Sequence, residues 1–87
     1  MPNIKSAIKR VEKAQRRTKR NKAIKSTVKT AIKKFQASLE QGDTSTAAVN
    51  LRNAIKTIDK AVTKGVLHRN TAARKKSILQ RKFNQAV

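Results

Sequence analysis

The side chains of this sequence that could do chemistry are almost all cations. Lys and Arg number 23, against 4 acidic residues, a single histidine and no cysteine. The histidine, His68, has no second His, Cys or carboxylate cluster beside it in the sequence, so we predict no metal site. The scattered acids supply no carboxylate pair, and no serine has an Asp–His partner. We therefore expect no catalysis, no cofactor and no small-molecule substrate.

The stretch QRRTKRNK, residues 15–22, is the densest basic segment. It has eight consecutive polar residues, five of them Lys or Arg, within an apparently continuous helical pattern. Like charges three and four residues apart repel one another and destabilise an isolated helix. A basic run is often only a solvated helix face. Taken alone, Lys25, Lys29 and Lys33 would fit a solvated face and a binding face equally well. For residues 15–22 we expect an external polyanion to compensate the repulsion.

The charge is unevenly divided along the chain. The formal net charge is +19, with +12 in residues 1–34, zero in residues 35–63 and +7 in residues 64–87. A coat that served only solubility would not need this division. Two basic regions joined by a neutral one indicate a binding face for a polyanion such as a nucleic acid.

Three helices must position these cations. The first is predicted over residues 3–40, with Asn3 as N-cap and Gly42 as the residue that stops it. The second is predicted over residues 45–64, capped by Asp43, Thr44 or Ser45 and stopped by Gly65; the third, over residues 70–85, is capped by Asn70. We expect one all-α domain over residues 1–87, without strands.

Apolar spacing indicates how the helices pack. The second helix has a clear stripe at three- and four-residue spacing: Ala47, Ala48, Leu51, Ala54, Ile55, Ile58, Ala61 and Val62. It should cover one face of the first helix, made of Ile24, Val28, Ala31, Phe35 and Leu39, and the third helix should turn Ala72, Leu79 and Phe83 inward.

The start of the first helix has a different apolar face. This earlier group is Ile4, Ala7, Ile8 and Val11. Its mean direction lies about 140° from that of the later face at about 100° per residue. The second helix is also too short to reach it. We therefore predict a three-helix bundle with a long first helix that projects beyond a short antiparallel bundle. Residues 1 to about 22 should be frayed, or only partly helical, without a partner.

The composition favours contacts to phosphates over contacts to bases. Phe35 and Phe83 are the only aromatic residues, and both occupy core positions. Without Tyr or Trp there is no platform on which single-stranded bases could stack. Lys outnumbers Arg by 15 to 8, which suits point-charge contacts to phosphates. Recognition of the backbone and shape of a folded nucleic acid fits best.

Two segments carry a family resemblance: DKAVTKGVLHRNTAARKKSIL at residues 59–79 and NIKSAIKR at residues 3–10. Together with the length and helix pattern, they closely resemble the bacterial small-subunit ribosomal protein S20 family. The resemblance implies an all-helical bundle with a long first helix. It also implies direct binding to small-subunit ribosomal RNA, help in folding that RNA during assembly, and neighbouring ribosomal components as partners. The basic residues of 4–10 and 64–77 match family segments and become contact candidates.

The predicted RNA-binding residues come from charge and from this resemblance. They are Lys5, Lys9, Arg10, Lys13, Arg16, Arg17, Lys19, Arg20, Lys22, Lys25, Lys29, Lys64, His68, Arg69, Asn70, Arg74, Lys75, Lys76 and Arg81. The expected location is the cytoplasmic ribosome, or the plastid stroma if the source bears plastids.

Three other interpretations remain open from the residues alone. A histone-like DNA-compacting protein would share the charge and the helices. A nuclear import signal would account for one basic run, although not for two basic helices. A membrane-active helix would need large apolar residues opposite its basic face. Because the aliphatic residues of the first helix lie on two divergent faces, we rank the membrane last and expect no membrane partner.

Overall fold

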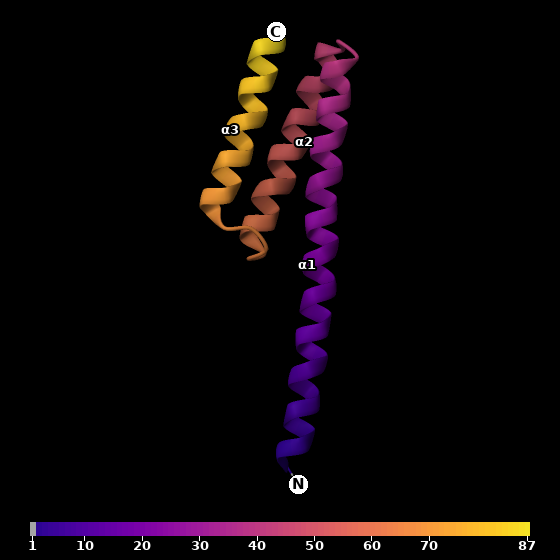
Figure 1. Cartoon of the computed structure of the whole chain (residues 1–87), viewed down its shortest axis with the longest axis vertical. Coiled ribbons are helices and arrows are strands. Elements are labelled where there is room, and N and C mark those ends of the chain that lie inside the picture. Colours follow the sequence, from indigo (N-terminus) through magenta and orange to yellow (C-terminus); the bar gives the residue numbers. More distant parts are fainter. Residues whose placement is uncertain (1) are drawn as a thin grey trace.

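The computed structural model describes the backbone of residues 2–87 and the side chains of residues 5–87, and within them it is all helical. The helices are α1 (Pro2–Glu40), α2 (Thr44–Thr63) and α3 (Arg69–Ala86). Figure 1 shows α2 running antiparallel beside the C-terminal half of α1, with α3 packed along α2 and the N-terminal half of α1 projecting alone. The predicted fold class is confirmed.

The projecting half of α1 makes the molecule a rod. Its principal extents are 65 × 22 × 13 Å and its radius of gyration is 17.6 Å, whereas a compact chain of this length would have about 12 Å. The 39 residues of α1 span about 58 Å at about 1.5 Å per residue. The single helix α1 therefore sets nearly the whole length of the protein.

The turn between α1 and α2 follows the predicted chemistry. Gly42 has φ +74°, the left-handed conformation that only glycine adopts at low cost. Asp43 is the N-cap of α2, and its side chain accepts hydrogen bonds from the backbone N–H of Thr46 at 3.1 Å and from the Thr46 hydroxyl at 2.6 Å. These bonds lower the pKa of the Asp43 carboxyl below its ordinary value of 3.8, and the bond from the Thr46 hydroxyl has the larger effect.

Two expected helix starts are wrong. α1 begins at Pro2, because proline fits the first helical position; Asn3 therefore lies inside the first turn, and its side chain is outside the described residues. α3 begins at Arg69, capped by His68, whose Nδ1 accepts a hydrogen bond from the backbone N–H of Asn70 at 3.1 Å. A ring nitrogen with a free lone pair thus does what the Asn70 side chain was expected to do.

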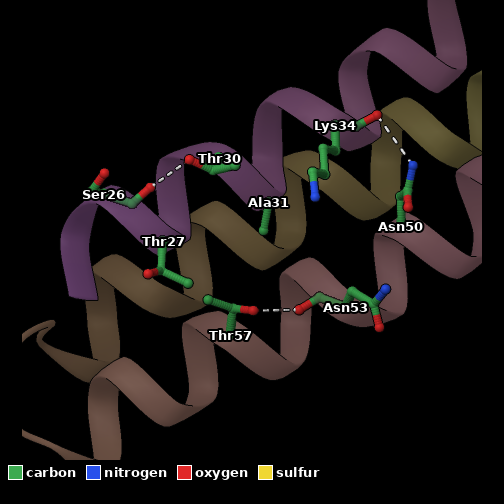
Figure 2. Close-up of a pocket in the computed structure, with 8 residues that line it drawn as sticks. All are labelled: Ser26, Thr27, Thr30, Ala31, Lys34, Asn50, Asn53 and Thr57. Carbon is green, nitrogen blue, oxygen red and sulfur yellow. Dashed lines mark hydrogen bonds between the residues drawn. The ribbon is translucent and has the colours of Figure 1, made fainter. Parts of the chain in front are cut away.

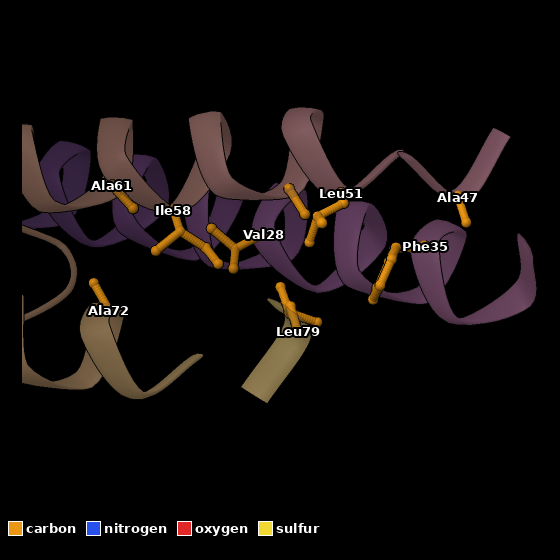
Figure 3. Close-up of a cluster of buried hydrophobic side chains, with 9 residues drawn as sticks. Val28, Phe35, Ala47, Leu51, Ile58, Ala61, Ala72 and Leu79 are labelled. Atoms are coloured by element: carbon orange, nitrogen blue, oxygen red, sulfur yellow. The ribbon is translucent and has the colours of Figure 1, made fainter. Parts of the chain in front are cut away.

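The core lies between the C-terminal half of α1, α2 and one face of α3 (Figure 3). Ala47, Ala54 and Ala61 recur every seven residues along α2 and are fully buried, and small side chains there let the helices approach closely. Phe35 and Phe83 meet with ring centroids 6.5 Å apart, which confirms both as core residues. The remaining buried apolar residues are Val28, Leu51, Ile58, Ala72 and Leu79.

Candidate nucleic-acid interface

The N-terminal arm, defined here as residues 5–20, has no protein cover. Every residue in it is exposed, including Ile8 at 53% and Val11 at 55% of full exposure. It carries eight cations and one acid, Glu12. By contrast, the other half of α1 contributes Val28 and Phe35 to the core. The predicted projection of the first half of α1 is therefore confirmed.

The cations of the arm lie on one side of α1. At about 100° per residue, all eight fall within an arc of about 180°, and the opposite half holds all the apolar side chains together with Gln15 and Thr18. The cations of this face, the arm face, are Lys5, Lys9, Arg10, Lys13, Arg16, Arg17, Lys19 and Arg20. Because its positive charge is confined to one side, the arm could hold one RNA segment against that side.

A second basic face runs along the other half of α1, on its solvent side. It consists of Lys22, Lys25, Lys29 and Lys33, which are all exposed. Its mean direction differs from that of the arm face by about 170°, because the opposite side of α1 is occupied there by the core. The basic charge of α1 thus changes sides within residues 16–22, where cations surround most of the helix.

Two residues mark this change of sides. The Arg20 guanidinium donates a hydrogen bond to the carbonyl of Lys64 at 3.4 Å, which joins the arm to the end of α2. Asn21, at the position where the apolar seam would continue, is half-buried, and its Oδ1 is buried without a hydrogen-bond partner. Arg17 is exposed, as expected for a residue beyond the last core layer.

The candidates around α3 divide by burial. Arg69, Asn70, Arg74 and Arg81 are exposed, and so are Lys64 and His68 in the preceding connection. Lys75 and Lys76 are half-buried, and the Lys76 ammonium pairs with the Asp59 carboxylate at 2.8 Å. This ion pair already partly neutralises Lys76, so we rank it below the other candidates for phosphate contact.

The candidate list left out Lys33 and Lys82. Lys33 continues the four-residue spacing of Lys25 and Lys29, and this spacing could have placed it among the predicted RNA-binding residues. Lys82 is exposed on α3, one residue after Arg81. Both belong with the candidate cations.

Among the described side chains, residues 5–87, no group of three or more His, Cys, Asp or Glu lies close enough to hold a metal ion. Over the same residues, no helix is long and apolar enough to cross a bilayer.

Comparison with known proteins identifies the family. A profile of the family described as ribosomal protein S20 matches residues 2–84. The chain belongs to the ribosomal protein S20 family. One relative, from Moorella thermoacetica, is 75% identical over all of this chain and 83% of its own length, and is named small ribosomal subunit protein bS20.

Other S20 relatives carry the same name. The one from Pelotomaculum thermopropionicum is 60% identical over 98% of this chain and 97% of its own length. The one from Heliobacterium modesticaldum is 48% identical over the whole chain and 99% of its own length. These are bacterial names for a component of the small ribosomal subunit and not for an enzyme. The S20 resemblance of residues 3–10 and 59–79 is confirmed at the level of the family.

Proposed function

We propose that this protein is a structural component of the small ribosomal subunit. It binds small-subunit ribosomal RNA directly through the phosphate backbone and helps to fold and stabilise that RNA during assembly. The observation that carries the proposal is the arm, a helix in which eight exposed cations stand without any covering protein. Membership of the S20 family supplies the class of RNA.

The two basic faces of α1 suggest how the protein would act on RNA. One RNA segment would lie along the arm face, and a second would lie on the opposite side, against Lys25 and Lys29. Each neutralised phosphate releases condensed counterions, which favours binding and makes it sensitive to salt. Residues 16–22, where the charge changes sides, would touch both segments and hold them together.

α3 would add a third region of contact. Arg74 and Arg81 are exposed on its outer face, away from the core residues Ala72 and Leu79. The bundle would then fix the direction of the arm relative to this second basic edge. Under this proposal, each of the predicted contact residues binds phosphate, and Lys76 contributes least to the affinity because it is paired with Asp59.

The bacterial relatives favour a cytoplasmic ribosome over one in a plastid. Within it, neighbouring ribosomal components are proposed partners besides the RNA. The arm projects beyond the bundle in a molecule 65 Å long, so it could reach components that the bundle does not touch.

Co-sedimentation tests the proposal. The tagged chain, expressed in a bacterium, should sediment with small-subunit particles and remain there after a moderate salt wash. In a competition at physiological salt, folded small-subunit ribosomal RNA should displace duplex DNA from the protein. Release from the particles together with equal affinity for duplex DNA would instead support a DNA-compacting protein.

A further inference from the structure

A polar groove lies between α1 and α2, on the face of this pair that α3 does not cover (Figure 2). Its volume is about 380 Å³. It does not include any of the predicted RNA-binding residues. Its lining consists of Ser26, Thr27, Thr30, Ala31, Lys34, Asn50, Asn53 and Thr57.

Three of the four hydroxyl groups that line this groove, all of them from threonines, are already committed as donors. Thr27, Thr30 and Thr57 each donate to the carbonyl four residues earlier, at 2.9, 2.9 and 2.7 Å. A hydroxyl has one hydrogen, so each of these oxygens can only accept from a ligand. The groove therefore presents three threonine oxygens as fixed acceptors, while the Ser26 hydroxyl can still donate or accept.

The asparagines extend this pattern. The Asn50 amide nitrogen donates to the Ser38 hydroxyl at 2.6 Å and to the Lys34 carbonyl at 3.3 Å, which leaves its oxygen as an acceptor. The exposed Asn53 side chain makes no hydrogen bond with another described residue, so both its donor and its acceptor are available. Lys34 supplies the one positive charge of the lining.

This chemistry selects among ligands. Phosphate oxygens are acceptors, so the three threonine oxygens do not attract them. A ribose 2′-hydroxyl can donate to a threonine oxygen, while the neighbouring phosphate meets a lysine. The 2′-hydroxyl also distinguishes RNA from DNA. The sugar edge of an RNA strand, with Lys34 on an adjacent phosphate, therefore fits the groove.

The groove also continues the arm face. Arg16, Thr27 and Lys34 point within about 20° of one another around α1. The Arg20 contact with the Lys64 carbonyl lies between arm and groove, at the end of α2. An RNA strand that follows the arm face would therefore reach the groove without crossing to another side of α1.

We propose that this groove binds the ribose–phosphate backbone of RNA and accepts hydrogen bonds from its 2′-hydroxyls. The proposal rests on the RNA-binding function proposed above and adds a site that recognises RNA as RNA. The basic faces supply attraction that DNA would share, and the groove supplies the difference between the two.

The test replaces three hydroxyls by methyl groups of similar shape: Thr27→Val, Thr30→Val and Thr57→Val together. Both residue types are β-branched, so helix content should be retained. The probe is small-subunit ribosomal RNA transcribed with scattered 2′-deoxynucleotides, in which positions that weaken binding are mapped. The triple variant should bind the all-RNA transcript about tenfold more weakly, since several neutral hydrogen bonds are lost. It should also lose specific 2′-deoxy interference positions.

A matched control lies on α2. Thr63 makes the same bond to the carbonyl four residues earlier, at 3.1 Å, but does not line the groove. Thr63→Val should leave affinity and interference unchanged. Lys34→Gln should instead lower the log–log salt slope by about 0.7 to 0.9 and keep the interference positions.

The outcomes separate the two proposals. A folded triple variant with the affinity and interference pattern of the unmodified protein would overturn the groove site and leave the proposed function intact. If the triple variant loses helix content, Asn53→Ala decides in its place, because alanine favours the helix; an unchanged interference pattern in that variant would overturn the site. An unmodified protein that does not bind the RNA would overturn both proposals.

Discussion

The two halves of α1 differ in what stabilises them. In the C-terminal half, Val28 and Phe35 are buried against α2 and α3, so helix formation and core formation support each other. In the arm, no residue is covered, and a short isolated helix is only marginally stable in water. One continuous helix therefore has its own core as the source of stability for one half only, and under the proposed function a bound polyanion would stabilise the other half.

The charge shows the same difference. Beside the bundle, the second basic face lies on the solvent side of α1, because the other side packs, and Lys34 lies at the edge of the packed side, in the groove. Along the arm, the cations occupy the side that continues the core face, and the apolar side chains of Ile8 and Val11 lie opposite. In the proposed complex, RNA would take in the arm the place that α2 takes in the bundle.

The largest expected effect is on the core half. Ile58→Ala removes a fully buried side chain and should lower the free energy of unfolding by about 2 to 4 kcal/mol. This corresponds to a fall of roughly 10 to 30 °C in the melting temperature of so small a protein. Ile8→Ala, in the exposed arm, should leave the melting temperature nearly unchanged. Equal losses at both sites, measured by thermal circular dichroism, would contradict the difference between the halves.

The next effect concerns the arm face. Replacing Arg16, Arg17 and Arg20 by Gln together removes three proposed phosphate contacts. The log–log salt slope of RNA binding should fall by about 2 to 3, with little change in helix content of the bundle. Arg52→Gln with Lys56→Gln is the control on the exposed side of α2 and should change the slope less. An unchanged slope in the triple variant would remove these arginines from the interface.

A smaller effect is expected where the halves meet. Because the Asn21 Oδ1 is buried without a hydrogen-bond partner, Asn21→Leu would relieve this unpaired atom and extend the apolar seam. The free energy of unfolding should rise by about 1 kcal/mol. Chemical denaturation provides the measurement. A loss of stability would mean that the unpaired Asn21 Oδ1 is not what ends the core half at this residue.

The smallest effect concerns the cap of α2. The folded state lowers the pKa of Asp43, so its ionised form stabilises the fold above the ordinary pKa and this contribution disappears as the pH falls through the folded pKa. Asp43→Asn keeps a capping oxygen and should flatten the acid side of the melting-temperature profile. An acid side as steep as that of the unmodified protein would mean that other groups cause it.

Much of the fold followed from the sequence, because it depends on local signals. The apolar stripe of α2 predicted the burial of Leu51 and Ile58. Gly42 and Gly65 were predicted to end the first and second helices, and both have the positive φ that this role requires. The His68 cap was missed because histidine is not among the residues that usually cap helices. Val66 and Leu67 lie between the predicted second and third helices, and they pack against the core. Their packing depends on the path of the turn in three dimensions, which the sequence pattern does not show.

The candidate site was predictable in part. Clusters of Lys and Arg are visible in any sequence, and every predicted cation in the arm is exposed. The groove was not visible, because Thr27 on α1 and Thr57 on α2 each look like an ordinary exposed helix residue. Only the pairing of the two helices brings their oxygens to one surface.

Amide hydrogen exchange tests most directly the claim that RNA stabilises the arm. Exchange in residues 7–22 is compared with exchange in residues 47–62, in the free protein and after addition of small-subunit ribosomal RNA. The account predicts fast exchange of residues 7–22 in the free protein, slow exchange of residues 47–62, and strong protection of both when RNA is bound. Equal, strong protection of the two segments in the free monomer would contradict it.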